Sequence, residues 1–389
     1  MVCLIKKIKN SKSSNVYQKA NSFVAMSSAK EITSQFDRIK NLQATLTEIS
    51  SKQDEIVANA CQDLLDQKIK RSPKFELKPF ILEEMQRLND DELFRYLYYR
   101  YRYDVYPATQ QLDEFPPCVQ IEPTSICNYR CVFCYQTDRN LTQSRHGHMG
   151  MMDLDTFKLI VDQIEGSVEA VTLASRGEPL MAKEIIPMLE YLSGKFLGLK
   201  MNTNASFLTE ERAHAILAAE PNTLVFSADA SDKELYAKLR VNGNLDTILS
   251  NIQLFNNIKS KFYPNSRTIT RVSGVRFNDK QDFSKIQTFW HDHVDQVAFV
   301  SYNPWESAYN APENDITEHC SDLWRRTFIW WDGITNPCDV DYRSTLSVGN
   351  IKNQSLTEIW LGDAYQKLRE IHQRKSRSTI LPCSGCTLV

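Results

Sequence analysis

Short apolar runs alternate with stretches of helical periodicity between residues 117 and 302, and this alternation constrains the fold more than any other feature of the chain. Strands are predicted at 119–123, 170–175, 199–204, 224–229, 270–277 and 296–302, with helices at 153–164, 183–192, 210–219, 245–260 and 283–291. Strands that alternate with helices form a parallel sheet with right-handed crossovers. Six strands are too few for a closed eight-stranded barrel. We therefore predict an α/β fold, a partial (β/α)6 TIM-like barrel that binds ligands at the carboxyl ends of its strands.

The flanking segments divide the chain further. Residues 1–30 are polar without a period, which indicates a disordered leader within which Met26 could be the true start. Residues 31–114 predict a helical extension, ahead of a core at 115–305. Its aromatic and basic run at 94–103 could bind anions, but we favour a helix that packs its tyrosines on the core and leaves its arginines in water. Residues 306–389 predict a small domain with one helix at 355–372. It has too few periodic apolar residues to fold without a stabilising cross-link or metal site.

Charge and hydropathy argue against two classes of partner. Lys and Arg total 46 against 48 Asp and Glu, whereas nucleic-acid-binding proteins usually carry a basic excess. No apolar run is long enough to span a bilayer, and residues 1–7 lack the long apolar segment of a secretory signal. We therefore expect a cytoplasmic protein without nucleic-acid or membrane partners.

Three cysteines lie close together directly after the first predicted strand: Cys127, Cys131 and Cys134. Without a secretory signal, clustered cysteines indicate metal ligands rather than disulfides. Thiolates are the usual ligands of [4Fe–4S] clusters, and three of them leave one iron open for a substrate or cofactor. A zinc site would need a fourth ligand, for which only His146 and His148 lie nearby, and the C-x3-C-x2-C spacing is unusual for zinc. We favour the iron–sulfur cluster.

This cysteine pattern, with Phe133 before the third cysteine, resembles the signature of the radical S-adenosylmethionine (SAM) superfamily. The resemblance implies that the open iron chelates SAM and that an external donor such as flavodoxin or ferredoxin supplies an electron. A 5′-deoxyadenosyl radical then forms and abstracts hydrogen from the substrate. The protein would supply position and exclude water.

Further motifs follow the later predicted strands in the order that the family pattern has. Arg176-Gly177-Glu178-Pro179 resembles the family's G-G-E-P motif, with arginine in place of the first glycine. A lone polar residue at a strand end usually caps a helix or turn, so the signal lies in the ordered set. The resemblance implies SAM-binding roles for Phe133, Gly177, Glu178, Pro179, Asn202, Thr203, Asn204, Ser227, Asp229 and Ser273.

A second group of four cysteines lies near the end of the chain: Cys320, Cys338, Cys383 and Cys386. Four thiolates can close an iron–sulfur cluster or hold zinc, and spacing alone does not choose between them. The segment from Cys320 to Trp360 resembles SPASM/twitch domains, and four cysteines fit the shorter twitch type found in aminocyclitol dehydrogenases. The resemblance implies one auxiliary [4Fe–4S] cluster that can accept an electron from the substrate.

These features predict a radical SAM oxidoreductase of the dehydrogenase type. We expect a two-electron oxidation of a small polyol, sugar or cyclitol, with Arg271 or Asp339 as the catalytic base; Asp341 and His148 are further candidates. The alternative is a maturase that modifies a ribosomal peptide or protein. A zinc-binding interaction module is a third reading, which leaves the ordered strand-end motifs unexplained. Fold alone does not choose among substrates.

Overall fold

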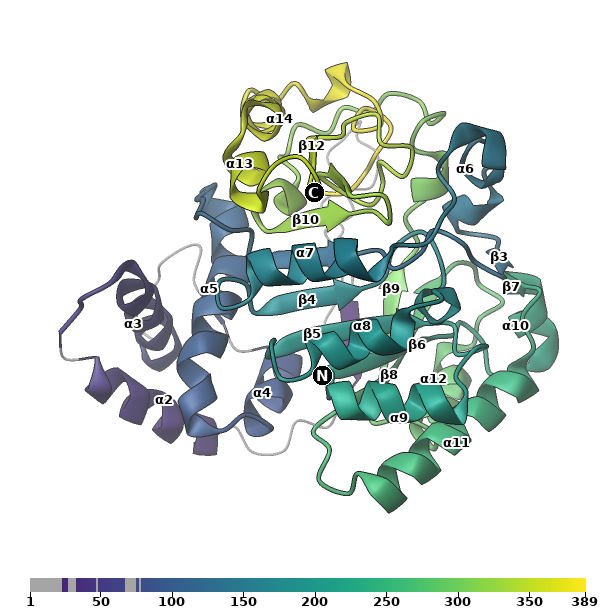
Figure 1. The fold of residues 1–389 in the computed structure, drawn as a ribbon, viewed down its shortest axis with the longest axis horizontal. Helices are drawn as coiled ribbons and strands as arrows, with labels where there is room; N and C mark the ends of the chain where they lie inside the picture. Colours follow the sequence, from purple (N-terminus) through teal and green to yellow (C-terminus); the bar gives the residue numbers. More distant parts are fainter. Residues whose placement is uncertain (1–22, 27–32, 47, 67–74, 77) are drawn as a thin grey trace.

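The computed structural model describes residues 23–26, 33–46, 48–66, 75–76 and 78–389 (Figure 1). Its centre is a sheet in which six parallel strands lie side by side in the order β9-β8-β6-β5-β4-β2. All six are the predicted strands, and their ends lie within two residues of the predicted ones. Their bounds are β2 (Cys118–Ile121), β4 (Ala170–Leu173), β5 (Gly198–Thr203), β6 (Thr223–Ser227), β8 (Ile269–Arg276) and β9 (Gln296–Ser301).

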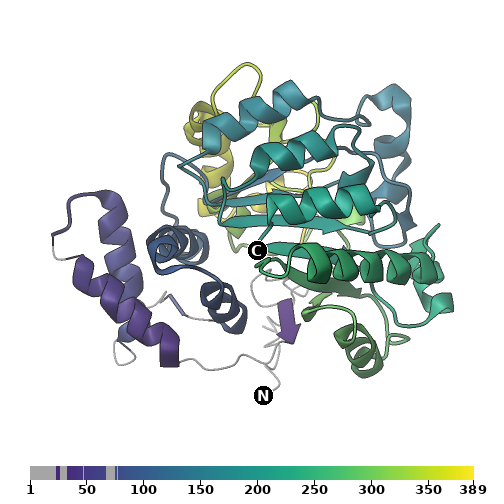
Figure 2. The ribbon, with the colours of Figure 1, turned by 60° about the horizontal axis from the view of Figure 1, so that its bottom comes forward.

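Helices cover one face of this sheet, as Figure 2 shows. They form because apolar residues recur at helical spacing and capping side chains mark their starts. For example, Asp153 accepts a hydrogen bond from the Thr156 amide at 2.7 Å, and the helix that follows buries Phe157, Ile160 and Ile164. The helices of this region are α7 (Leu154–Ile164), α8 (Ile185–Leu192), α9 (Glu210–Ala219), α10 (Lys233–Leu239), α11 (Leu245–Phe262) and α12 (Phe283–His291). The sheet stays open, so the predicted partial barrel is confirmed.

Strands from outside the core extend the sheet at both edges. On one side β10 (Arg326–Ile329) pairs in parallel with β2, and β11 (Ile334–Asn336) and β12 (Gly349–Asn350) continue the sheet. On the other side β1 (Phe23–Met26) pairs antiparallel with β9. β1 lies within the expected leader and departs from that expectation; the rest of residues 1–30 lies outside the described residues.

The helical extension contains α2 (Thr33–Thr45), α3 (Lys52–Leu65), α4 (Pro79–Gln86) and α5 (Leu93–Thr109), which share an apolar core of their own. Tyr96 is buried in that core of the extension, whereas the aromatic run was expected to pack its tyrosines on the barrel core. The expectation that the arginines stay in water is wrong for Arg100 and Arg102, which are buried. Arg102 lies over the ring of Tyr98 at 4.3 Å, and Arg100 bonds Asp104 at 2.8 Å, so both charges are compensated within the fold.

The C-terminal region shares the core of the barrel. Val119 of β2, Ile329 of β10 and Trp360 belong to one buried apolar cluster. The prediction of a single helix at 355–372 is wrong. The structure has two helices there, α13 (Leu356–Leu361) and α14 (Asp363–Gln373). Gly362 separates them in an extended conformation, and a Cβ there would lie 2.5 Å from the Glu358 carbonyl oxygen. Within the described part of the chain, no helix is long and apolar enough to cross a membrane.

Candidate active site

The loop after β2 carries the first cysteine group. Cys127, Cys131 and Cys134 pack in one small apolar cluster with Tyr129 and Phe133. Strand pairing holds the loop in place. The short strand β3 (Arg130–Cys131) within the loop pairs antiparallel with β7 (Arg240–Val241), which lies outside it. The short helix α6 (Arg139–Thr142) follows. The cysteine spacing is thus fixed by sheet pairing as well as by chain length.

The chemistry of these thiols fits a metal cluster. Burial raises the pKa of Cys127 to about 12 and also raises those of Cys131 and Cys134. Thiols bind iron as thiolates, so loading the site releases protons and needs the positive charge of the metal. Among the residues that the structure describes, no three potential ligands converge on one point as a single ion would require. A cubane does not require this, because each thiolate binds a different iron.

Arg240 lies against this group and was not singled out from the sequence. Its guanidinium forms an ion pair with buried Asp229 at 2.6 Å, and its Nη1 lies 3.7 Å from the sulfur of Cys131. Asp229 therefore faces Arg240, and its Oδ1 accepts from the Val275 amide at 2.6 Å. Only the β3–β7 pairing brings residue 240 to the cysteine loop, so no local signal marks it.

The Gly-Glu-Pro motif packs behind the cysteine loop. A Cβ on Gly177 would lie 2.3 Å from the Thr124 carbonyl oxygen, so this backbone approach requires glycine. Buried Glu178 accepts hydrogen bonds from the Thr203 hydroxyl and the Asn204 amide, both at 2.6 Å, and ties the motif to the end of β5. Burial raises the pKa of Glu178 even though these bonds favour its charged form. Pro179 begins the short helical turn that follows.

A cavity of about 490 Å³ runs through the barrel interior. Cys131 and Cys134 line it, as do four of the candidate SAM contacts: Phe133, Asn202, Ser227 and Ser273. The remaining candidates are not among its lining residues: Gly177, Glu178, Pro179, Thr203, Asn204 and Asp229. Buried oxygen atoms of Asn202 and Ser175 have no hydrogen-bond partner among the described residues, which leaves them available to a ligand.

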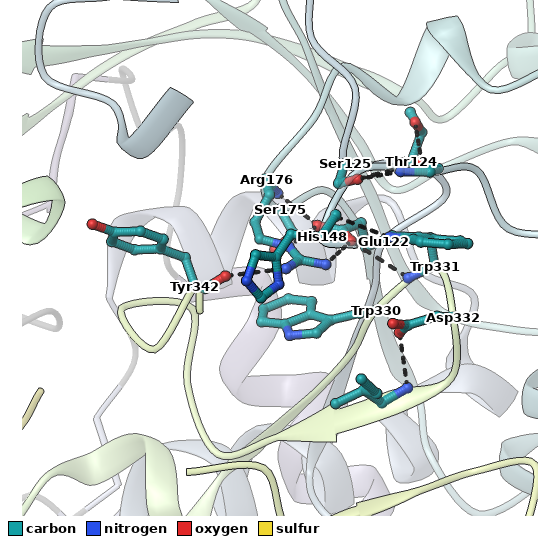
Figure 3. A network of polar contacts seen from close by, with 12 residues as sticks. Glu122, Thr124, Ser125, His148, Ser175, Arg176, Trp330, Trp331, Asp332 and Tyr342 are labelled. Atoms are coloured by element: carbon teal, nitrogen blue, oxygen red, sulfur yellow. Dashed lines mark hydrogen bonds and ion pairs between the residues drawn. The ribbon is translucent and has the colours of Figure 1, made fainter. Parts of the chain in front are cut away.

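Arg176 connects the motif to the C-terminal domain. Its guanidinium makes two bonds to the buried Glu122 carboxylate, at 2.8 and 2.6 Å, and lies over the ring of Trp330 at 4.4 Å (Figure 3). It also donates to the Tyr342 carbonyl oxygen at 3.1 Å. Burial opposes the charge of Arg176, but Glu122 outweighs it, so its pKa is raised. The side chain that departs from the family motif thus bridges two domains.

The second cysteine group lies in the C-terminal domain. Cys320, Cys338 and Cys386 pack around one apolar cluster. The pKa of Cys338 is raised mainly by burial and next by the nearby Cys383 thiol. The surrounding loops are held by buried side chains, because Arg377 donates to the Cys386 carbonyl oxygen at 2.9 Å and His372 accepts from the Cys320 amide at 3.1 Å. The structure therefore brings all four predicted ligands into one region.

The four candidate bases have different surroundings. Arg271 and Asp339 line the cavity, and one Asp339 oxygen has no hydrogen-bond partner in the described structure. Asp341 accepts from Tyr309, from both Thr345 donors and from the Leu346 amide, so its carboxylate shapes a loop. His148 lies beside Arg176 (Figure 3), where burial and that charge lower its pKa. Asp339 is the best placed of the four.

Residues 121–286 match the sequence profile of the radical SAM superfamily, and residues 320–387 match that of the iron–sulfur cluster-binding SPASM domain. Together the matches span more than half of the chain, which therefore belongs to the radical SAM superfamily. Within it, the chain is a SPASM-type enzyme. Its radical SAM domain implies SAM and a [4Fe–4S] cluster, and its SPASM domain implies auxiliary iron–sulfur ligation.

Three similar proteins illustrate the range of this family. The GTP 3′,8-cyclase of Desulforamulus reducens is 23% identical over 192 residues, which are 48% of this chain and 57% of that enzyme. SuiB of Streptococcus suis, solved with its precursor peptide SuiA, has a TM-score of 0.55 at 15% identity and covers 86% of this chain and 78% of its own. BtrN, solved in complex with AdoMet and 2-DOIA, has a TM-score of 0.49 at 15% identity, and the match covers 72% of this chain and 95% of BtrN. The likeness to SuiB shows the fold and not the substrate.

Proposed function

We propose that this enzyme oxidises a small polyol, sugar or cyclitol by two electrons. One observation carries the proposal: one partly open cavity is lined both by the cluster cysteines Cys131 and Cys134 and by Asp339, which directly follows the auxiliary cysteine Cys338 in the chain. A substrate in this cavity would contact the radical source at one side and the auxiliary domain at another. The cavity's volume of about 490 Å³ suits small molecules.

The proposed oxidation removes a hydrogen atom, a proton and an electron from one carbinol. When bound, the first cluster and SAM supply a 5′-deoxyadenosyl group that takes the hydrogen atom from carbon. Asp339 would take the hydroxyl proton, and an auxiliary cluster held by Cys320, Cys338, Cys383 and Cys386 would accept the remaining electron, so that a carbonyl is left. The protein's part is to hold the carbinol near the SAM-binding residues Asn202, Ser227 and Ser273 and to exclude water, and Asp339 supplies the base.

Substitution of single cysteines tests this division of roles. Anaerobic reconstitution should give about eight irons per chain if two [4Fe–4S] clusters form. Cys127→Ala should abolish SAM cleavage, whereas Cys383→Ala should retain some uncoupled cleavage but form no carbonyl product. Cys61→Ala, a buried thiol of α3 outside both groups, is the matched control. Equal loss of cleavage in Cys127→Ala and Cys383→Ala would count against the electron-acceptor role.

The base is tested separately. With a C-deuterated polyol, deuterium should enter 5′-deoxyadenosine in the wild type and in Asp339→Asn, because hydrogen abstraction precedes proton loss. The variant should form about 10²-fold less carbonyl product, the lower range for a lost general base. Unchanged product formation would remove Asp339 from the mechanism.

The alternative proposal is modification of a peptide or protein. It is supported by the fold likeness to SuiB, because that structure holds a precursor peptide. The size of the cavity counts against it, because a volume of about 490 Å³, lined on one side by Glu84, Tyr99 and Arg100 of α4 and α5, suits a small molecule better than a peptide chain. Deuterium transfer from a labelled peptide, but from no polyol, would favour the alternative.

A further inference from the structure

The geometry points to an anion-binding floor at the inner end of the barrel cavity, formed by Lys200, Arg271 and Arg326, that holds a phosphate or carboxylate group of the substrate. This inference rests on the proposed function, because it adds a charged group to the proposed polyol. The three residues are far apart in sequence and come from β5, β8 and β10. All three line the cavity that the cluster cysteines border.

Lys200 is the central residue of this floor. Gly198, Lys200 and Asn202 alternate along β5 and all line the cavity, so Lys200 lies one side-chain layer, about 7 Å, further in than Asn202. Its ammonium group has no hydrogen-bond or ion-pair partner among the described residues. Burial, followed by the charges of Arg271 and Arg326, lowers its pKa to about 7. A bound anion would offset both the burial of the ammonium charge and its repulsion from the two arginines.

The two arginines face the same space and make contacts with neutral groups. Arg326 donates to the hydroxyl of Tyr103 on α5, with its Nε at 2.9 Å. Arg271 donates from Nε to the Gln296 amide oxygen at 2.6 Å. Arginines so fixed can form bidentate bonds to a phosphate or carboxylate without further ordering.

Carboxylates near the floor do not neutralise it. Asp104 and Asp322 are already paired with Arg100 and Arg325, at 2.8 and 3.0 Å. Glu84 lines the cavity and Glu83 bonds Gln296, so both offset part of the charge on Lys200 and Arg271. Below about pH 7, where Lys200 is protonated, three cations face these two carboxylates and leave a positive excess in the cavity, where charge interactions are stronger than in bulk water.

The substrate class follows from this placement. The anionic group would bind at the floor, and the carbon to be oxidised would extend outward to the layer of Asn202, Ser227 and Ser273. We therefore expect a polyol that carries a phosphate or a carboxylate at a position remote from the oxidised carbinol. Binding energy from such a remote group positions the reacting carbon.

Calorimetry on the anaerobically reconstituted full chain tests the floor with two probes that keep their charge between pH 6.5 and 8.5: sodium sulfate, as a stand-in for a phosphate ester, and sodium malonate. Wild-type enzyme should bind one of them at least fivefold more tightly at pH 6.5 than at pH 8.5. At pH 8.5 it should take up a proton on binding, detected as a dependence of the heat on the buffer. Preference for sulfate assigns a phosphate, and preference for malonate assigns a carboxylate.

Lys200→Met should weaken binding at least tenfold and abolish the proton uptake, and Arg326→Gln should weaken it without abolishing the uptake. Lys285→Met, on exposed α12, should match the wild type. If Lys200→Met loads less iron than wild type, Arg326→Gln decides the result. Absence of binding by both probes, or wild-type affinity in both floor variants, overturns the inference. Wild-type anion affinity in Lys200→Met with loss of polyol oxidation would instead make Lys200 a catalytic base.

The same experiments separate this inference from the proposed function. Oxidation of uncharged polyols without anion binding would sustain the proposed function and reject the floor. Anion binding without oxidation of any polyol would sustain the floor and reject the proposed function.

Discussion

The side chain of Arg176 couples the Gly-Glu-Pro motif to the C-terminal domain. Its charge is compensated by Glu122, and both groups are buried. A buried ion pair adds little net stability compared with apolar residues, but removal of one partner leaves an uncompensated charge. Arg176 therefore matters most for the relative position of the two domains.

We expect Arg176→Met to reduce the free energy of unfolding by about 3–5 kcal/mol, because it leaves Glu122 buried and unpaired. The double variant Glu122→Gln/Arg176→Met should recover part of this loss. Urea unfolding under anaerobic conditions measures both. Arg374→Met, which removes a surface pair with Glu370, is the control and should change stability by less than about 1 kcal/mol. Wild-type stability in Arg176→Met would show that the pair is unimportant.

Lys200 should make stability depend on pH. Its pKa is about 7 in the fold against 10.5 for an ordinary lysine, so between these values the unfolded chain binds more protons. The free energy of unfolding must therefore rise as the pH rises from about 7 towards 10.5, and below pH 7 the cost of burying the charge is constant.

In the wild type this increase in the free energy of unfolding between pH 7 and 9.5 should be roughly 1–3 kcal/mol, after allowance for water in the cavity. Lys200→Met should lack it. Urea unfolding of the two proteins at both pH values measures the difference, in which the titration of the shared cysteines cancels. Lys285→Met should behave like the wild type. Parallel pH profiles for wild type and Lys200→Met would contradict the lowered pKa.

At the scale of elements, α5 closes the inner end of the barrel. It is fastened there at two points, because Arg95 bonds Glu169 at 2.6 and 2.8 Å and the Tyr103 hydroxyl bonds Arg326 of β10. Glu92, which directly precedes α5, also pairs with Arg267 at 2.6 Å. The helical extension thus forms one wall of the candidate substrate cavity.

Tyr103→Phe should destabilise the protein by about 1–3 kcal/mol, because it removes the acceptor of the half-buried Arg326 guanidinium. Thermal unfolding followed by circular dichroism measures the loss. Tyr191→Phe removes a hydroxyl that bonds Asp162 at the surface and should have little effect. An unchanged melting temperature in Tyr103→Phe would mean that water replaces the hydroxyl.

At the scale of the whole molecule, the radical SAM core and the SPASM domain form one sheet and one apolar core. β10 covers the edge of β2, with Arg326 opposite Cys118 and Ile329 opposite Ile121. An uncovered strand edge invites aggregation. The core is therefore not expected to fold as an independent unit.

A fragment of residues 1–305 should aggregate or lose its cooperative unfolding transition, because β2 becomes an exposed edge and part of the shared core is removed. Size-exclusion chromatography and circular dichroism test this. Full-length Cys383→Ala is the control, because it loses a proposed ligand of the auxiliary cluster but keeps β10. A monomeric, cooperatively folded fragment would refute the single-core description.

Local patterns were enough to predict the strand–helix series, both cysteine groups and the partial barrel. Cysteine spacing and hydrophobic periodicity are short-range properties, so they can be read directly from the chain. The break at Gly362 was missed because the helical period continues across it, and only the backbone contact with Glu358 reveals it. The buried state of Arg100 and Arg102 was missed because their partners are supplied by packing.

The sequence by itself determined the superfamily and the kind of cofactor, and it predicted the cysteines that would hold the clusters. Tertiary structure alone decided that β10 continues the barrel sheet, that Arg176 joins two domains, and that Lys200, Arg271 and Arg326 meet in one cavity. Those contacts depend on which strand edges pair over long sequence separations. No local period or spacing encodes such pairings, whereas the free energy of burying the shared core does.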